Sequence, residues 1–537
     1  MTLKINLFMW SMAFLPVIVL LLLMVKFQWG AAEAAPVGLF VSLFVGMVFF
    51  KGNWELIASQ SAKGIWNALT ILIVIWPAIL IYEVTNEAEA FEAFKRGMQK
   101  FTPNELLQIL AIGWVFVSFL QGITGFGVPI AVGAPLLVGI GVLPIWGVII
   151  PLLAHAWAGT FGTLAVAWEA LLFQTGFTGT AMSNSIALWA TAFIWLINLI
   201  AGLSICWYYG KKEGLKKGLP AVLVISTIHG GGQMVLSQLN QTLAAFIMTC
   251  VALGAVFILG KSKWYRDKWY IEDSKMMERT GGPLEDKQDG EIDVTINEAF
   301  LPYYVLTAIT LLVLLVPPIN NLLGSWKLGL PFRATSTGYG VVNPAEDMYS
   351  PLSPLTHAGT FLLIAGLVGY FYFYKKGKIS KGGGMRIFMR IVEKTAPSTV
   401  AIVALIIMSR IMSGTGQTTV LAMGTANILG RSYVLLAPSV GLLGSFMTSS
   451  NMSSNILFGE FQQTTAEILR LNQAAILGAQ TAGGAIGNAI APGSIILGTT
   501  TAGILGEEGS VLRRTLPIAL GIAALCGIIL FIALIIL

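Results

Sequence analysis

The sequence predicts an all-α polytopic membrane protein of about 12 transmembrane helices, with two re-entrant hairpins and two interrupted helices arranged as an inverted-topology repeat. Of its 537 residues, 56% are hydrophobic and only 11% are charged, whereas a soluble domain carries roughly 25% charged residues. Two segments, 119–168 and 444–495, also place glycine, serine, threonine and asparagine where apolar membrane helices are expected.

These two segments lie in opposite halves of the chain and resemble each other. One constant offset of 325 residues relates Ala154, His155, Gly159 and Gly162 to Ala479, Gln480, Gly484 and Gly487. Lipid cannot hydrogen-bond an opened backbone, so such segments persist at membrane depth only where protein or a water-filled cavity covers them. Paired broken segments in corresponding halves indicate the binding site of a transporter. The pattern therefore predicts that the chain moves a small solute across the lipid bilayer.

Composition excludes several other classes of protein. The net charge of +6 does not indicate a nucleic-acid-binding protein. The basic residues lie in short loops between apolar runs, which is typical of membrane topology. The three cysteines lie inside apolar runs without metal-ligand spacing, so we expect no disulfide framework and no metal site. The run 7–25 lacks a strongly basic start and a cleavage site, and we interpret it as a retained first helix.

Hydropathy places the spans in order along the chain. Apolar runs of membrane-spanning length occupy 7–25, 35–50, 64–82, 144–175 (interrupted), 183–207, 219–238, 240–260, 299–317, 355–374, 395–412, 472–505 (interrupted) and 513–536. The segments 105–137 and 433–466 turn over a Gly/Pro or Ser/Asn centre, and we interpret both as re-entrant hairpins. The amphipathic segment 87–100 is expected along the membrane interface.

The chain divides into two halves joined by a polar loop. Residues 1–260 hold the hairpin 105–137 and the interrupted helix 144–175, whereas 299–537 hold the hairpin 433–466 and the interrupted helix 472–505. The loop 261–298 has mixed charge and is expected to be a solvated cytoplasmic connector. The loop 318–353 is rich in glycine, proline and aromatic residues.

Charge orients this topology. Placing the following loops in the cytoplasm puts 24 of the 32 lysines and arginines on that side, as the positive-inside tendency favours: 26–34, 83–104, 210–218, 261–298, 375–394 and 506–514. Both termini are then extracytoplasmic. The two hairpins enter from opposite sides, and the spans 64–82 and 395–412 run in opposite senses. This is the inverted repeat that permits alternating access, by elevator-type movement of one bundle against a scaffold.

The hairpin tips carry the candidate binding groups. In the first, three glycines (Gly122, Gly125 and Gly127) and Pro129 favour an open turn whose N–H groups can hold an anion. In the second, seven of the eight residues 448–455 are polar, and such a run cannot face lipid at low cost. The alternative is a helix–helix seam of small polar residues. The density of the cluster and its match to the first hairpin favour a binding site.

The interrupted helices supply the facing wall and the titratable candidates. His155 lies near the middle of the first and titrates close to neutral pH when unperturbed, so it is either a proton carrier or a neutral hydrogen-bonding residue. Arg410 ends an apolar span and is a possible counter-charge to the substrate, although an arginine there can also reach water. Glu169 and Glu460 are weaker proton-carrier candidates.

No nucleotide-binding fingerprint occurs, so the chain's own ATP hydrolysis does not drive transport. The three histidines are scattered, which argues against a membrane-embedded enzyme, and two hairpins that block the path from opposite sides argue against a passive channel. We expect no cofactor, and a proton or sodium gradient as the source of energy.

Several motifs of the sequence resemble the signatures of a known family. FLQGITGFGVPIAVGAPLLVGIGVLPIWG resembles the first signature of the lactate permeases, and GSFMTSSNMSSNILFGEFQ, AQTAGGAIGNAIAPGSI and TAGILGEEGSVLRRT resemble the C-terminal signature. These motifs cover about a quarter of the chain. The resemblance implies a bacterial plasma-membrane permease that takes up lactate, glycolate or a related 2-hydroxy monocarboxylate with protons.

The sequence departs from the pattern that this resemblance implies. Gln121, Asn451 and Asn488 stand where the family usually has Glu, Asp and Lys, and His155 stands where it usually has Asn. Amides do not titrate. Either His155 has taken over proton coupling, or the substrate and the coupling ion differ.

We therefore expect a proton symporter of lactate or a related anion, with sodium coupling or another anion (a sulfonate or a dicarboxylate) as the alternative. A homodimer is left open. The residues expected to bind the substrate are Gln121, Thr124, Gly125, Gly127, Thr160, Gly162, Ser449, Ser450, Asn451, Ser453, Asn455, Gln480, Thr481, Asn488 and Ser494.

Overall fold

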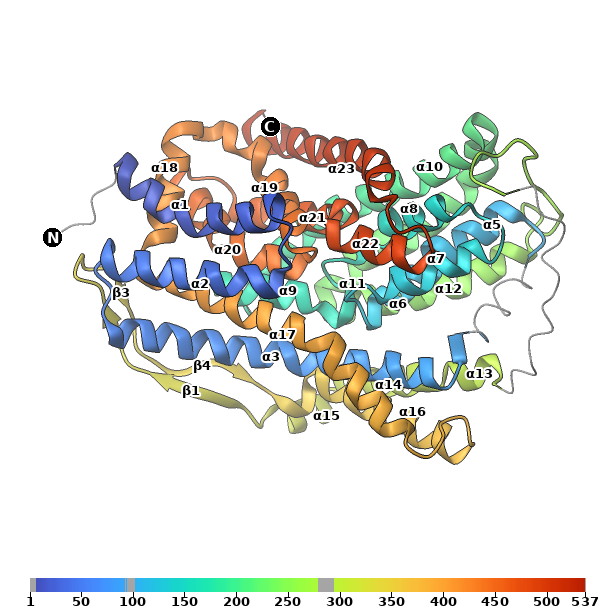
Figure 1. The fold of residues 1–537 in the computed structure, drawn as a ribbon, viewed down its shortest axis with the longest axis horizontal. Coiled ribbons are helices and arrows are strands. Elements are labelled where there is room, and N and C mark those ends of the chain that lie inside the picture. The colour runs from blue at the N-terminus through green and yellow to red at the C-terminus, as the bar shows by residue number, and fades with distance from the viewer. Residues whose placement is uncertain (1–5, 92, 94–101, 279–293, 537) are drawn as a thin grey trace.

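The structure is a computed structural model that describes residues 6–91, 93, 102–278 and 294–536. Most of these residues are helical, and most helices lie roughly along the long axis of the molecule (Figure 1). Within the described residues, ten helices are long and apolar enough to cross a membrane, or up to twelve if each of two bent pairs is one span. The prediction of about 12 spans is confirmed, and the chain is a multi-pass membrane protein.

Five helices form one side of the molecule, which we call the scaffold. The helices α3 and α17 pack on each other along much of their length, α2 packs on α17, and α16 packs on α3 (Figure 1). The bounds are α1 (Leu7–Leu21), α2 (Ala31–Val48), α3 (Trp54–Glu87), α16 (Ala358–Lys375) and α17 (Gly383–Thr415). Both α3 and α17 extend well beyond the predicted spans 64–82 and 395–412, because hydropathy detects only the apolar centre of a helix whose polar ends also stay helical.

The two predicted hairpins are present. The first consists of α5 (Glu105–Leu110), η2 (Ala111–Phe116), α6 (Val117–Ile123) and α7 (Val128–Val138). The second consists of α19 (Tyr433–Thr448) and α20 (Asn451–Ile468). Each hairpin follows a scaffold helix in its half of the chain and precedes a broken helix, which is the order that the inverted repeat requires.

The two interrupted helices are also broken where the sequence predicts. The first comprises α8 (Pro144–Ala154), η3 (Ala156–Ala158) and α9 (Gly162–Thr175), and its two parts meet at 56°. The second comprises α21 (Gln473–Gly487), η7 (Asn488–Ile490) and α22 (Pro492–Thr501), with Ala491 in extended conformation between the last two.

The remaining helices complete the bundle and differ from the predicted spans in places. The predicted loop 210–218 is mostly helical, because only Gly210 and Lys211 leave helical geometry within α10. The helix α18 was not among the predicted spans, and α14 and α15 meet at 86°. The bounds are α10 (Ala181–Ser226), η4 (Thr227–Gly232), α11 (Gln233–Leu239), α12 (Ala244–Lys261), α13 (Ile296–Ala299), α14 (Leu301–Leu315), α15 (Pro317–Gly324), α18 (Gln417–Leu429) and α23 (Glu508–Phe531).

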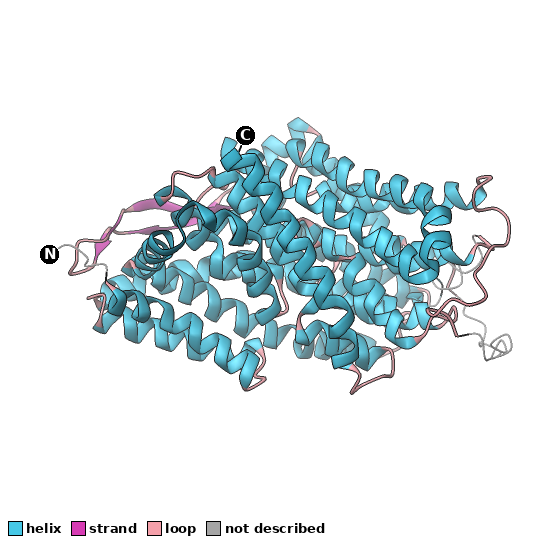
Figure 2. Cartoon of the chain, turned by 90° about the horizontal axis from the view of Figure 1, so that it is seen from above, coloured by secondary structure: helices cyan, strands magenta, loops and turns pink. Residues whose placement is uncertain are grey.

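The loop 318–353 adds four short strands to the helical class. The strand β1 (Leu328–Phe332) pairs antiparallel with β4 (Glu346–Leu352), and β2 (Thr335–Ser336) pairs with β3 (Val342–Asn343). Figure 2 shows the strands toward one end of the molecule. This ribbon is fixed to α3, where the Lys63 ammonium lies 2.6 Å from the Glu346 carboxylate.

The polar loop 261–298 is only partly described, and a few buried side chains anchor its first part, which is otherwise largely exposed. Tyr265 is fully buried, and its hydroxyl donates to the Lys217 carbonyl at 2.8 Å and accepts from the Ala221 N–H at 3.0 Å. Residues 279–293 and most of the predicted interfacial segment 87–100 lie outside the described residues.

Candidate functional site

The tip of the first hairpin is an open turn in left-handed backbone conformation. Gly125, Phe126 and Gly127 have φ of +57°, +46° and +84° in succession. Glycine adopts this region readily, whereas Phe126 does so at an energetic cost. The helix α7 begins directly after the turn. Pro129 has no N–H, and the N–H groups of Val128 and Ile130 donate to the Gly125 and Gly127 carbonyls at 3.0 and 3.1 Å.

The tip of the second hairpin is built from serine rather than glycine. Ser449 has φ of +54°, and Ser450 is extended and caps α20 by accepting from the Ser453 N–H at 3.2 Å. The Ser449 hydroxyl in turn accepts from the Gly493 N–H at 3.2 Å, close to the start of α22. The N-termini of α20 and α22 are therefore held together by one serine.

The first broken helix carries a left-handed turn without any glycine. Thr163, Leu164 and Ala165 have φ of +52°, +50° and +69°. Each such residue costs roughly 1–2 kcal/mol relative to right-handed geometry. Strain of this kind persists only where the surrounding structure enforces it, and it is frequent at functional sites. The turn places Thr163 against the first hairpin, where a side chain on Gly125 would meet its hydroxyl at 2.1 Å.

The two tips and the two breaks enclose a cavity of about 400 Å³. Scaffold residues at the start of α2 and in the middle of α17 close it on the remaining side. Its wall includes Gly30, Ala31, Ala32, Gln121, Phe126, Gly127, Gly159, Gly162, Thr163, Pro397, Ser398, Ala401, Ser449, Ser450, Asn451, Ser453, Asn488, Gly493, Ser494 and Leu497. None of the described residues in this wall is charged, so backbone dipoles and neutral polar groups determine its chemistry.

The first turns of α2, α7, α20 and α22 line this cavity. Their first residues or caps in the wall are Gly30 with Ala31, Gly127, Ser450 with Asn451, and Gly493 with Ser494. The N-terminus of a helix carries roughly half a positive charge. The convergence of these N-termini on one uncharged cavity makes it favourable for an anion.

A hydrogen-bonded layer behind the wall fixes Asn451. Its Nδ2 lies 3.2 Å from the Gly159 carbonyl, 3.2 Å from the Thr160 hydroxyl and 3.3 Å from the Thr481 hydroxyl. The Asn455 amide donates to the Thr481 hydroxyl at 2.9 Å. Residues of the two broken helices therefore meet at one amide of the second hairpin.

His155 lies next to the cavity and reaches it through Asn488. The ring is buried, its Nδ1 lies 2.6 Å from the Pro151 carbonyl, and its Nε2 lies 3.4 Å from Asn488 Nδ2. Because the carbonyl can only accept, Nδ1 carries the proton and Nε2 is free to accept from the amide. The Asn488 Oδ1 accepts from the Ser494 hydroxyl at 2.6 Å.

The structure brings nine of the predicted substrate-binding residues to the cavity wall. They are Gln121, Gly127, Gly162, Ser449, Ser450, Asn451, Ser453, Asn488 and Ser494. The other six are outside it: Gly125 supports the turn, and Thr160, Thr481 and Asn455 form the layer behind Asn451. The Thr124 hydroxyl donates to the Leu120 carbonyl at 2.9 Å. Gln480 bonds to Gln462 at 2.9 Å.

The three charged candidates lie away from the wall. Arg410 is 3.3 Å from Gln60 and its guanidinium lies 5.7 Å from the centre of the Tyr349 ring, on the side of the scaffold that bears the β ribbon. Glu169 faces His357 at 4.0 Å, and Glu460 accepts from the Ser413 hydroxyl. Within the described residues, no group of three or more His, Cys, Asp or Glu side chains could hold a metal ion.

Sequence reasoning missed the scaffold side of the cavity. Ser398 and Pro397 of α17 and residues 30–32 of α2 line it. Pro397 stands inside the helix α17 and was the available signal, since a proline there frees a backbone carbonyl. Thr163 belongs to the stretch 159–163 that the sequence placed in the facing wall, and it lines the cavity, although it was not among the residues expected to bind the substrate.

Comparison with known proteins identifies the family. The chain matches the family described as L-lactate permease over residues 10–537. An L-lactate permease of Halalkalibacterium halodurans is 25% identical over 515 residues, which cover 95% of this chain and 94% of that protein. A glycolate permease of Escherichia coli K12 is 25% identical over 551 residues, with 96% and 94% covered.

Among solved structures, the YdaH transporter of Alcanivorax borkumensis aligns over 87% of each chain, with a TM-score of 0.40 and 14% identity. The family assignment rests on the sequence match, which runs from residue 10 to the last residue and includes both hairpins and both broken helices. The chain belongs to the L-lactate permease family.

Proposed function

We propose that this protein is a secondary transporter that takes up lactate or a related 2-hydroxy monocarboxylate by proton symport across the bacterial plasma membrane. The observation that carries the proposal is the convergence of helix N-termini, those of α2, α7, α20 and α22, on one uncharged cavity, which favours a small anion. Relatives named L-lactate permease and glycolate permease support the substrate class. Membership of a permease family indicates a transporter rather than an enzyme.

The anion's carboxylate would lie between the hairpin tips. The backbone N–H groups of Asn451 and Ser494, at the starts of α20 and α22, and the Ser450 hydroxyl would be its donors in the wall. The Asn451 amide, held by the layer behind it, orients the second hairpin toward the first broken helix. The cavity of about 400 Å³ also leaves room for water around a three-carbon acid.

Proton coupling in this proposal operates through the pair His155 and Asn488. Neutral His155 accepts at Nε2, so the Asn488 amide nitrogen is turned toward the ring. A proton on Nε2 would convert that acceptor into a donor, and Asn488 would have to rotate to present its oxygen. Its amide N–H groups would then face Ser494 and the cavity, where they can donate to a carboxylate. Proton and anion would thus bind together.

Movement would carry the hairpins and broken helices as one unit against α3 and α17. Few polar contacts join this unit to α17: the Ser409 hydroxyl donates to Gln174 at 2.9 Å, and the Ser413 hydroxyl donates to Glu460. Such contacts are weak enough to be exchanged during transport. The positive-inside distribution supports extracytoplasmic termini, and a homodimer remains a prediction.

The test is uptake of labelled L-lactate into proteoliposomes, under an imposed proton gradient and separately under a sodium gradient. We expect proton-driven uptake by the wild type. In His155→Ala, uptake should no longer respond to the proton gradient, whereas exchange of external for internal lactate should continue. The control is His357→Asn, because His357 caps α16 outside the cavity and asparagine preserves a cap.

Two results would contradict the proposal. Absence of L-lactate uptake under both gradients, in folded wild-type protein, would contradict the proposed substrate class. Uptake that is driven by sodium and does not respond to the proton gradient would leave the proposed substrate class in place and contradict the proposed role of His155 in coupling.

A further inference from the structure

A second cavity of about 190 Å³ adjoins the candidate site. The two cavities share four wall residues, Phe126, Gly127, Ser398 and Leu497. The second extends from this shared wall along α3 and α17, toward the ends of these helices that bear Glu87 and Gly383. It is therefore a continuation of the site between the first hairpin and the scaffold.

Lys394 of α17 lines this second cavity. Among the described residues in the walls of both cavities, it is the one with a charged side chain. Its ammonium group lies 2.5 Å from Glu83 Oε1 and 4.4 Å from the centre of the Tyr82 ring, and 44% of the side chain is exposed. Apolar Ile75 and Ile79 form the adjacent wall.

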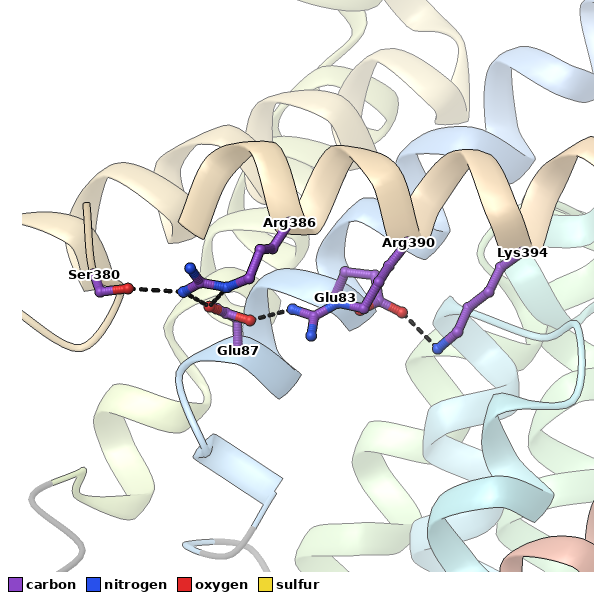
Figure 3. Close-up of polar contacts among 6 residues, drawn as sticks. All are labelled: Glu83, Glu87, Ser380, Arg386, Arg390 and Lys394. Carbon is purple, nitrogen blue, oxygen red and sulfur yellow. Dashed lines mark hydrogen bonds and ion pairs between the residues drawn. The ribbon is translucent and has the colours of Figure 1, made fainter. Parts of the chain in front are cut away.

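Lys394 is the last member of an ion-pair ladder between α3 and α17 (Figure 3). Arg386, Arg390 and Lys394 are spaced four residues apart on α17, and Glu83 and Glu87 are spaced four apart on α3, so each set lies on one helix face. Arg390 Nε lies 2.9 Å from Glu83 Oε2, and Arg386 lies 2.5 Å from Glu87.

The ladder has three cations for two carboxylates, so it carries one excess positive charge. Glu83 is fully buried and contacts both Arg390 and Lys394. A buried carboxylate needs at least one cationic partner, and Arg390 supplies it. Lys394 is therefore the member of the ladder that can exchange partners, because Glu83 would keep Arg390 if Lys394 turned to another anion.

We propose that the second cavity is a second anion-binding site, in which Lys394 pairs transiently with the carboxylate of a small monocarboxylate on its way between the main cavity and the predicted cytoplasmic side. This inference rests on the proposed function and adds a second position for the same substrate. An anion that moves between the two positions passes Phe126 and Ser398, which line both cavities.

The test compares variants of one ladder in L-lactate exchange by proteoliposomes. Lys394→Gln and Arg386→Gln remove the same charge from the same helix, but only Lys394 lines the cavity. We expect Lys394→Gln to raise the KM of exchange roughly fivefold, which is about 1 kcal/mol of charge attraction in water-filled space. Arg386→Gln should change it less than twofold, and Lys394→Arg should stay close to the wild type.

Two further readouts separate binding from a structural role. Higher ionic strength should raise the KM of the wild type but not that of Lys394→Gln, because salt screens an exposed charge. Glu83→Gln should act in the opposite direction and lower the KM, because it removes the carboxylate that competes for Lys394. A merely structural ladder would give losses of the same sign in both variants.

The outcomes distinguish this inference from the proposed function. Wild-type exchange with equal KM values for Lys394→Gln and Arg386→Gln would overturn the second site and leave the proposed function in place. Absence of wild-type exchange would overturn both.

Discussion

Gly484 offers a direct test of how Asn451 is positioned in the cavity wall. Gly484 lies on α21 beneath the Asn451 amide, and a methyl group added there would lie 2.0 Å from Asn451 Oδ1. The next nearest atoms are Asn451 Cγ at 3.1 Å and the Ser445 hydroxyl oxygen at 3.3 Å. The Gly484→Ala substitution therefore acts mainly on one side chain, which can move, rather than on the backbone of a neighbouring helix.

The size of the effect follows from these distances. A carbon atom does not approach an oxygen within about 3 Å, so the amide must move by about 1 Å. The three contacts of Asn451 Nδ2 are already 3.2, 3.2 and 3.3 Å long, so most of them would exceed hydrogen-bonding distance. Each lost bond costs roughly 0.5–1.5 kcal/mol. We expect uptake to fall by roughly tenfold to a hundredfold, at about 1.4 kcal/mol per tenfold.

The assay is the initial rate of L-lactate uptake, with the melting temperature of the purified protein as a measure of folding. Gly521→Ala is the matched control, because nothing lies within 4 Å of a methyl group added to this residue of α23. Alanine also favours a helix over glycine by about 1 kcal/mol. This control should keep uptake and should not lower the melting temperature.

A double-mutant cycle decides whether Gly484 acts through Asn451. In the Asn451→Ala background the clashing oxygen is absent, so Gly484→Ala should cause little further loss. An equal further loss in that background would refute the steric reasoning.

Two other predictions concern stability. Ala165→Gly should relieve the left-handed φ of +69° and so raise the free energy of unfolding by up to about 1 kcal/mol. The melting temperature should therefore rise, and an unchanged or lower melting temperature would contradict the assigned strain. Glu298 accepts from the Thr295 N–H and hydroxyl, which hold the pKa of Glu298 at about 2, below its ordinary value of 4.5. This stabilisation is fully present above pH 4.5 and is lost as the pH falls through about 2, so Glu298→Ala should melt lower than the wild type at pH 6. That gap should narrow below pH 4.5, and a gap independent of pH would exclude the carboxylate as its cause.

The sequence was sufficient for the main outline of the fold. Both hairpins and both breaks occur where glycine, proline or clustered serine and asparagine interrupt apolar runs. The helix α18 was missed because its residues, such as Thr418 and Asn427, are too polar for a hydropathy window, although α20 packs beside it. The strands β1 and β4 were missed because they lie outside the bundle, and side-chain contacts such as that of Lys63 with Glu346 attach them to α3.

The site could be predicted only to the level of segments. The second hairpin is buried on almost every side, so helical periodicity does not separate residues that face the cavity from those behind it. Ser453 lines the cavity, for example, whereas the Ser454 hydroxyl donates to the Gly441 carbonyl at 2.7 Å. The left-handed turn at Thr163 has no glycine within it, and local sequence gives no sign of a conformation that only surrounding contacts enforce.

The three departures from the family pattern lie together in the structure. Gln121, Asn451 and Asn488, which stand where the resemblance implies two acids and a lysine, come from three different elements and all line the one cavity. Replacement of the two acids and the lysine together leaves the wall uncharged and removes its titrating groups. His155 is in contact with one of these three amides, so the titratable group nearest to the replaced ones lies one hydrogen bond behind the wall. In the proposed coupling, a site of this kind would bind an anion through helix N-termini and still respond to a proton, because the proton would change the orientation of an amide rather than the charge of the wall.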